Sequence, residues 1–424
     1  MWWILLVPAV LLVLLAAVGY AFFRYAMRRK NTYTEDEDKD VVSIISYDGL
    51  CLYAKQVVRN PDKWVILLHG YKGCREDVEE KYAAPYVQQA YSLLIPDLRA
   101  HGHSEGKYTG MGWLDRLDLQ SWIQFLVVTY PAAQIVLHGH SMGAATVLMA
   151  SGEQLPQNIY AIVADCAYTS VADIFTRVLK TWFKLPPFPI RYISSLFCRI
   201  FCGFFYEAAS AVEQVKKSKT PTLFFHGKAD DFVPYAMGQA LYAAAGCEKK
   251  MVSYEDAGHC ESALQDTYAR EVFTFLVRLR PFTYDDVLYI KINWVTTRLP
   301  GYKLPFADEE LRKVLDEWNS GEYKGDVCLI YAIGMPGEIA GVASLIFHGK
   351  TASMGISISS EFQHQGIGTE TVRQLMKIAR EKGAERLKSR VRANNVESVG
   401  LHQKCGFTMT EDGEICSWEY DLKK

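Results

Sequence analysis

Short runs of apolar residues recur through the first two thirds of the chain, and longer stretches of mixed polar and apolar positions separate them. Runs of about five apolar residues bounded by turn residues are typical of strands buried on both faces of a sheet. We expect such strands at 64–68, 134–138, 160–164, 223–227 and 251–254. With helical segments between them, they predict an α/β fold over residues 41–280, ending in a helix at 269–279.

The pattern changes near residue 281. A chain of 424 residues, half of them hydrophobic, exceeds what one domain needs and can bury a second core. We therefore expect a smaller α+β domain over 281–424. Its predicted strands are 326–333, 339–346, 351–358 and 386–391, and its predicted helices are 283–292, 308–318 and 369–382.

The amino terminus carries the longest apolar run of the chain. Trp2 to Phe23 contains no charged residue and would span roughly 33 Å as a helix, enough to cross the hydrocarbon core of a bilayer. A signal peptide would carry positive charge before its apolar core, whereas here the charges come afterwards, at Arg24, Arg28, Arg29 and Lys30. A buried core helix is the other alternative, but the run is unusually long for one.

We therefore expect a transmembrane anchor with a basic flank at 1–30. By the positive-inside rule that flank is cytoplasmic, which predicts a single-pass protein of the cell membrane with both domains in the cytoplasm. Residues 31–40 form a polar, mostly acidic linker. The net charge of −2 gives no sign of nucleic-acid binding.

A serine lies between two glycines directly after the apolar run at 134–138, in Gly139-His140-Ser141-Met142-Gly143. The G-x-S-x-G pattern after a strand is typical of a nucleophile elbow, where the serine takes a strained conformation and its neighbours must be small. The pattern also occurs by chance in Gly-rich loops, so it needs partners elsewhere in the chain.

Two partners follow in the order serine, acid, histidine. Asp230 lies in the loop after the strand at 223–227, and His259 lies in the loop after the strand at 251–254. Taken singly, Asp230 is an N-cap candidate for a helix near Pro234, and a loop histidine is usually a solvated side chain. Three such residues in this order, each just past a strand, favour a catalytic triad.

A fourth element is the turn His69-Gly70-Tyr71-Lys72-Gly73, which ends the strand at 64–68. Acyl transfer needs two fixed N–H donors for the negative oxygen of the tetrahedral intermediate. We expect the elbow to supply one from Met142 and this turn to supply the other from Tyr71. The alternative is an ordinary strand-to-loop turn.

These residues give 41–280 a resemblance to α/β-hydrolases of the serine aminopeptidase-like or cell-surface hydrolase group. The resemblance implies Ser141, Asp230 and His259 as the triad and an acyl-enzyme formed from an ester or thioester. Pro96 to Ser104 also resembles the D-x-R-G-x-G-x-S loop of that family, with Ala100 where glycine is commoner. In this loop His101 and His103 could in principle bind a metal, but no further ligand cluster supports one, and we expect them to hold the loop.

Residues 167–219 are rich in Phe, Leu, Ile and Tyr, and we interpret them as a helical cap. A cap shapes an acyl pocket and excludes water, which suits a moderately hydrophobic substrate. Plain packing and a membrane-facing surface are the other interpretations of the same composition.

The second domain carries the sequence Gln363-His364-Gln365-Gly366-Ile367-Gly368 at the entry to the helix 369–382. Glycines in such a loop let successive N–H groups point at an anion, and the positive end of the helix dipole adds to the attraction. After the strand at 386–391 comes the stretch Asn394 to Phe407.

Together these motifs resemble the GNAT acetyltransferases over about 281–424. In that family the loop holds the pyrophosphate of acetyl-CoA, an asparagine contacts the pantetheine arm, and a tyrosine protonates the departing thiolate. The resemblance assigns acetyl-CoA to a loop made of Gln363, Gln365, Gly366, Gly368 and Thr369, with Asn395 beside it. His402 stands at the tyrosine position, where a histidine can donate a proton at neutral pH.

Two interpretations of the second domain therefore stay open, an N-acetyltransferase acting on an amine and a module that only binds acetyl-CoA. In the second case the whole chain would be a membrane-tethered sensor or scaffold. The ten cysteines are scattered rather than spaced as a disulfide framework or a zinc site, which agrees with a cytoplasmic location.

Overall fold

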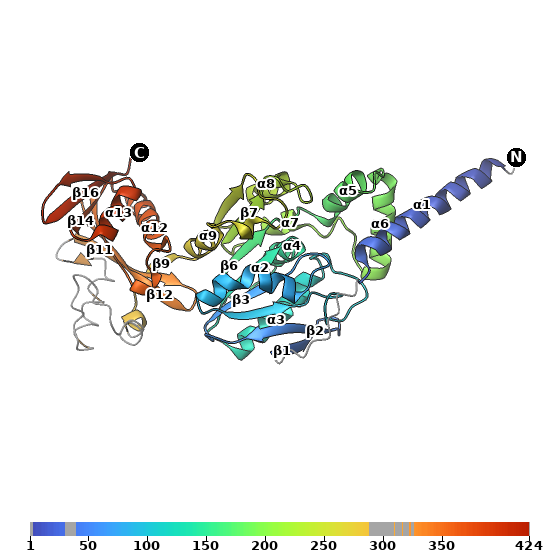
Figure 1. The fold of residues 1–424 in the computed structure, drawn as a ribbon, viewed down its shortest axis with the longest axis horizontal. Coiled ribbons are helices and arrows are strands. Elements are labelled where there is room, and N and C mark those ends of the chain that lie inside the picture. Colours follow the sequence, from blue (N-terminus) through green and yellow to red (C-terminus); the bar gives the residue numbers. More distant parts are fainter. Residues whose placement is uncertain are drawn as a thin grey trace. The chain divides into compact units, whose positions relative to one another are not determined.

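The computed structural model of the protein describes residues 3–29, 40–287, 309, 316, 322–323 and 326–423 (Figure 1). Contacts between residues divide the chain into two compact units, Met1–Ala269 and Arg270–Lys424. Each unit has its own sheet. The α/β sheet followed by a second sheet domain is the fold class expected from the sequence.

The first unit is built on an eight-stranded sheet of order β1-β2-β4-β3-β5-β6-β7-β8. The strands are β1 (Val41–Ile45), β2 (Cys51–Val57), β3 (Lys63–Leu68), β4 (Ser92–Pro96), β5 (Gln134–His140), β6 (Ile159–Asp165), β7 (Thr222–Gly227) and β8 (Lys249–Tyr254). β1 and β2 pair antiparallel, while β4, β3, β5, β6, β7 and β8 pair in parallel. All five apolar runs predicted as strands lie in this parallel part, so its carboxyl ends share one edge.

Helices connect the parallel strands and pack on the sheet (Figure 1). They are α2 (Arg75–Gln88), α3 (Asp115–Thr129), α4 (Met142–Ala150) and α8 (Tyr235–Ala244). α9 (Tyr268–Phe275) follows β8, the last strand of this sheet. Every residue of α4 is buried, and the helix contacts β3, β5 and β6. The small side chains Ala144 and Ala145 let it lie close to the sheet.

The segment expected to form a cap contains α5 (Val171–Thr181), α6 (Pro187–Cys202) and α7 (Ala211–Val215). α5 and α6 pack on each other, whereas α7 packs against α4 and α8. α5 and α6 are therefore the two helices that suit the expected cap, and α7 belongs to the layer of helices on the sheet.

The amino-terminal helix α1 (Trp3–Met27) runs four residues beyond the predicted end at Phe23. Residues 7–27 are long and apolar enough to cross a membrane, by length and composition. The last turns behave differently, since Phe22, Phe23, Ala26 and Met27 are buried in the core of the first unit. They pack there because α1 lies along α6 (Figure 1).

The second unit contains a sheet of order β10-β11-β12-β13-β14-β16-β15, with β9 also paired to β11. The strands are β9 (Arg278–Pro281), β10 (Glu322–Tyr323), β11 (Asp326–Met335), β12 (Glu338–His348), β13 (Thr351–Ile358), β14 (Arg386–Arg392), β15 (Thr408–Glu411) and β16 (Ile415–Asp421). The helices α12 (Ile367–Glu381) and α13 (Val396–Lys404) follow β13 and β14. β13 and β14 are its parallel pair.

The predicted helix at 269–279 is too long, because α9 ends at Phe275 and residues 278–281 form β9. A short apolar segment does not distinguish helix from strand by periodicity, and here pairing with β11 decides. The contacts accordingly divide the chain at 269/270, before the expected start of the second domain at 281. The predicted helix 308–318, most of the helix 283–292 and nearly all of the linker 31–40 lie outside the described residues.

Candidate active site and cofactor site

Ser141 stands at the turn between β5 and α4 with φ 52° and ψ −115°, a strained conformation for a residue with a side chain. Two glycines make this turn possible. A Cβ on Gly139 would lie 2.3 Å from the carbonyl of Gly143, and a Cβ on Gly143 would lie 2.2 Å from the carbonyl oxygen of Leu68. The turn is therefore a nucleophile elbow in its backbone geometry.

The structure brings Ser141, His259 and Asp230 together from the loops after β5, β8 and β7. His259 Nε2 lies 2.9 Å from Ser141 Oγ, and His259 Nδ1 lies 2.7 Å from Asp230 Oδ2. The other oxygen of Asp230 accepts the N–H groups of Phe232 and Val233 at 3.0 and 2.8 Å. Asp230 thus fixes both its own loop and the histidine ring.

The electrostatics of His259 follow from these contacts. Because a carboxylate only accepts, Nδ1 carries a proton toward Asp230, and once the ring is neutral its Nε2 accepts from Ser141. Burial lowers the pKa of His259, but Asp230 and the neighbouring Cys260 outweigh burial and raise it to about 10. The ring is a strong base held next to a buried hydroxyl.

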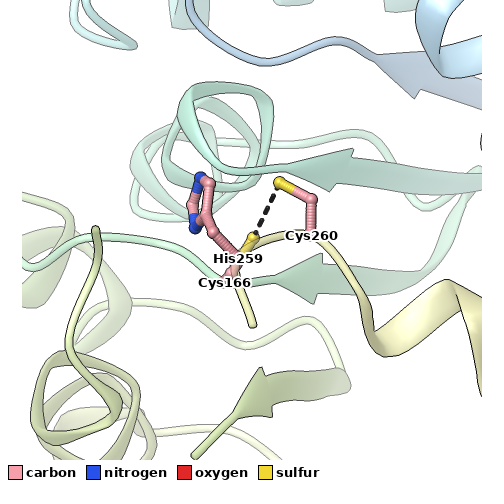
Figure 2. Close-up of side chains that lie close together, drawn as sticks. All are labelled: Cys166, His259 and Cys260. Atoms are coloured by element: carbon pink, nitrogen blue, oxygen red, sulfur yellow. Dashed lines mark hydrogen bonds between the residues drawn. The ribbon is translucent and has the colours of Figure 1, made fainter. Parts of the chain in front are cut away.

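Two thiols beside His259 were not singled out by the sequence analysis. Cys166 follows β6 and Cys260 follows His259, and their sulfur atoms lie 3.4 Å apart (Figure 2). The Cys166 thiol lowers the pKa of Cys260, burial opposes this, and His259 adds to the lowering, which leaves the pKa at about 6. The one sign of this thiol pair in the sequence is that Cys260 directly follows the candidate catalytic residue His259.

Donor atoms of Cys166, His259 and Cys260 lie within 4.8 Å of one another, a spacing compatible with a metal site. Both ring nitrogens of His259 are already bonded, to Ser141 and Asp230. The described geometry therefore suits the hydrogen-bonded triad better than ligation of an ion.

The turn after β3 lies next to the serine. A Cβ on Gly70 would lie 3.4 Å from Ser141 Cβ. The N–H of Gly70 donates to His140 Nε2 at 3.1 Å and that of Lys72 donates to His101 Nε2 at 3.2 Å. Between them, the N–H of Tyr71 is the one that this turn can offer to a substrate oxygen, and Met142 begins α4, where N–H groups lack intrahelical partners.

In the loop at 96–104, the side chain of His101 forms hydrogen bonds with backbone groups. His101 Nδ1 donates to the carbonyl oxygen of Arg99 at 2.9 Å, and its Nε2 accepts from Lys72. Burial lowers the pKa of His101 to about 3, so the ring stays neutral. His101 is a loop-structure residue, as the sequence indicated.

In the second unit a cavity of about 610 Å³ opens where β13 and β14 part. The strands pair from Thr351 opposite Arg386 only as far as Ser353 opposite Lys388, although both strands continue. Beyond that point Ile356 and Ile358 line one side of the cavity and Val391 lines the other. The gap exposes unpaired strand edges, which can bind an extended ligand through its amides.

The glycine-rich loop lies at the mouth of this cavity. Gly366 has φ +86° and precedes the first turn of α12, and Gly368 and Thr369 line the cavity with Gln363. The first N–H groups of α12 have no intrahelical partners and carry the positive end of its dipole, which suits a pyrophosphate. The side chain of Gln365 donates to the carbonyl oxygen of Glu361 at 2.8 Å and holds the loop.

Asn395 directly precedes α13, and His402 lies within it. Asn395 caps the helix, since its Oδ1 accepts the N–H of Ser398 at 3.0 Å, and it also lines the cavity. His402 lines the cavity as well, and its Nδ1 lies 2.6 Å from the carbonyl oxygen of Ser398. Nδ1 must donate there, so Nε2 of the neutral ring is an acceptor, buried and without a hydrogen bond in the described structure. Burial lowers the pKa of His402 and so favours this neutral form.

Three family profiles match the chain. Residues 63–195 match the alpha/beta hydrolase fold, 189–261 match serine aminopeptidase S33, and 277–408 match the acetyltransferase (GNAT) domain. GNAT domains generally use acetyl-CoA as their cosubstrate.

Two curated relatives are similar to part of the chain. The uncharacterized protein YqkD of Bacillus subtilis is 29% identical over 206 residues, 48% of this chain and 68% of the relative. The uncharacterized protein Rv2307c of Mycobacterium tuberculosis is 24% identical over 275 residues, 61% of this chain and 90% of the relative.

Among solved structures, the esterase Pf2001 of Pyrococcus furiosus is similar with a TM-score of 0.45 and 27% identity, covering 56% of this chain and 90% of the esterase. On the family profiles and the fold, the chain is an enzyme that joins an α/β-hydrolase domain to a domain of the GNAT acetyltransferase family.

Proposed function

We propose that the first domain hydrolyses an ester or thioester through an acyl-enzyme on Ser141. The observation that carries this proposal is the position of His259, 2.9 Å from Ser141 Oγ and 2.7 Å from Asp230. A serine hydroxyl is a weak nucleophile unless a base removes its proton, and a base must lie within hydrogen-bond reach.

The proposed reaction has two steps. Ser141 Oγ attacks the carbonyl carbon while its proton passes to His259 Nε2, and the N–H groups of Tyr71 and Met142 stabilise the negative oxygen. His259 then returns the proton to the leaving alkoxide or thiolate. Water repeats the sequence on the acyl-enzyme, releases the acid and restores Ser141.

A panel of nitrophenyl esters and acyl thioesters of increasing chain length, assayed with wild type and Ser141→Ala, tests this proposal. We expect the variant to lose activity by a factor on the order of 10³ or more, since a triad acts as a unit. Undiminished turnover by Ser141→Ala would remove the proposed nucleophile.

For the second domain we propose binding of acetyl-CoA, with the pyrophosphate at Gly366, Gly368 and Thr369 and the pantetheine arm between β13 and β14 near Asn395. The bound cosubstrate would supply an acetyl thioester for transfer to an amine. The cavity and the glycine loop support the position.

His402 favours a second candidate, a domain that binds acetyl-CoA without transferring the acetyl group. Its Nδ1 donates to Ser398, so its buried Nε2 carries a lone pair rather than a proton. A thiolate leaving group needs a donor, whereas an amide N–H of the ligand or an amine substrate needs an acceptor.

Calorimetric titration with acetyl-CoA, combined with release of free coenzyme A thiol across a panel of amines, distinguishes the two. Binding and thiol release support the transferase, binding alone supports the binding module, and no heat contradicts both. His402→Phe should weaken binding if Nε2 accepts a ligand N–H, because a buried acceptor is then lost.

We further propose that α1 anchors the chain in the cell membrane with both domains in the cytoplasm. The apolar run and the basic residues after it support this orientation. Labelling of a cysteine placed before residue 3 from outside intact cells tests the proposal. Protection of that cysteine would contradict the orientation.

A further inference from the structure

Large exposed hydrophobic side chains of the described residues gather in two places, on α1 and between Trp182 and Phe205. On α6, Tyr192, Leu196 and Ile200 are spaced by four residues and are 52, 51 and 62% exposed, and the 75% exposed ring of Phe188, whose backbone is not helical, lies 5.8 Å from the ring of Tyr192. Residues four apart share one face of a helix, so they form a continuous stripe. We call this stripe, with Trp182 and Phe183, the cap stripe. A stripe of this size facing water is unusual in a soluble domain and indicates a contact surface.

The cap stripe is continuous with the helix proposed to enter the membrane. A Cβ on Gly19 would lie 2.5 Å from Ile193 Cγ2. The rings of Tyr20 and Phe197 meet edge to face, and those of Phe23 and Phe201 stack. These contacts run in the same order along both helices. Tyr192, next to Ile193, therefore lies beside the part of α1 that precedes its first charged residue, Arg24. If lipid surrounds that part of α1, lipid also contacts the cap stripe.

The segment that carries the stripe is basic in sequence, although Glu207, outside this segment, pairs with Arg191 at 3.0 Å. From residue 177 to residue 202 the sequence contains no acidic residue and five basic ones, Arg177, Lys180, Lys184, Arg191 and Arg199. A helix with an apolar face and basic residues beside it is typical of segments that lie in the headgroup region of an anionic bilayer.

The stripe also begins next to the candidate active site. The rings of Trp182 and Phe232 lie 5.1 Å apart, and those of Phe232 and His259 lie 5.0 Å apart. Arg177 donates to the carbonyl oxygens of Asp231 and Phe232 and ties α5 to the loop of the acid. A path of two aromatic rings therefore links the exposed stripe to the base of the triad.

From these observations we infer that the cap stripe lies in the interfacial region of the bilayer beside α1, so that the hydrolase takes a lipid ester whose acyl chain is held in the membrane. This inference rests on the proposed hydrolase and anchor. It adds the bilayer as a partner of the cap and a membrane-resident ester as the substrate class.

Site-specific photocrosslinking of the full chain tests the surface. A benzophenone amino acid is placed at Leu196, at Leu12 on α1, or at Val128 on α3, which is 68% exposed and apolar but outside the stripe. The protein is reconstituted in vesicles of phosphatidylcholine with phosphatidylglycerol. We expect lipid adducts at Leu12 and Leu196 and none at Val128.

The outcomes separate the two proposals. Adducts at Leu12 without adducts at Leu196 would overturn the surface and leave the anchor standing, whereas no adduct at Leu12 would overturn the anchor. Crosslinks from Leu196 to a second copy of the chain would make the stripe a protein interface and overturn the bilayer assignment.

The substrate class is tested with the double variant Leu196→Glu and Ile200→Glu, and Val128→Glu as the matched control. We expect hydrolysis of a long-chain ester held in vesicles to fall about tenfold or more, because two apolar side chains no longer enter the interface. Hydrolysis of a water-soluble short-chain ester should be unchanged. Equal activity of the double variant and the control on the vesicle substrate would overturn the inference. Ser141→Ala should lose activity on both esters, and this result tests the triad rather than the stripe.

Discussion

The pKa of His259 sets the pH at which Ser141 can be activated. Since Asp230 and Cys260 raise that pKa to about 10 against the effect of burial, the ring is charged at neutral pH and becomes a base as the pH rises. We therefore expect kcat/KM for a soluble ester to increase with pH toward an alkaline midpoint.

Cys260→Ser tests the cause of this pKa. Its thiolate, favoured by a pKa of about 6, carries the negative charge beside the ring, and removing that charge makes the imidazolium less stable. The midpoint of the pH profile should fall by on the order of one pH unit. Cys51→Ser, on β2 and remote from the triad in the sheet order, is the control. An unchanged midpoint in Cys260→Ser would show that the thiolate is not the cause.

At this scale the sequence named Ser141, Asp230 and His259, because chain order and the positions after strands are visible in it. The thiol pair was not visible, since Cys166 and Cys260 are far apart in the chain and meet only when β6 and the loop after β8 are adjacent. The tautomer of His402 was not visible either, because it depends on a helix carbonyl oxygen 2.6 Å away.

At the scale of elements, the elbow depends on the close approach of α4 to β3. Gly143→Ala would place a methyl group 2.2 Å from the carbonyl oxygen of Leu68, and backbone at that distance must shift. We expect a loss of about 1–3 kcal/mol or more of unfolding free energy, measured by calorimetry of the full chain.

Gly400→Ala provides the comparison. A Cβ at Gly400 meets nothing within 4 Å, and the residue lies within α13. Alanine favours a helix by about 1 kcal/mol over glycine, so stability should be kept or rise. A Gly143→Ala protein as stable as wild type would contradict the packing account of the elbow.

The strands of the first sheet were predictable because buried parallel strands are continuous apolar runs. The ends of α1 and α9 were not predictable, because the apolar residues there are placed by tertiary contacts that the sequence does not show. Phe22 and Phe23 look like membrane residues but pack in the core, and Leu279 looks helical but pairs with Ile333 in a strand.

At the scale of the molecule, the two units have separate sheets and separate candidate sites. Gly368→Val should crowd Ile358 and Leu401 and weaken acetyl-CoA binding, while ester hydrolysis stays at the wild-type rate. Ser141→Ala should abolish ester hydrolysis and leave acetyl-CoA binding at the wild-type level. Calorimetry and ester assays on the same preparations measure both, and loss of hydrolysis in Gly368→Val would show that the domains are coupled.

The central claim is that Ser141 is an activated nucleophile. A fluorophosphonate reacts with a serine only where a base and an oxyanion hole are in place, and intact-protein and peptide mass spectrometry locate the adduct. We predict one adduct per chain, on the peptide that contains Ser141, absent from Ser141→Ala and strongly slowed in His259→Gln. An adduct on another residue, or none on a folded wild-type chain, would contradict the account.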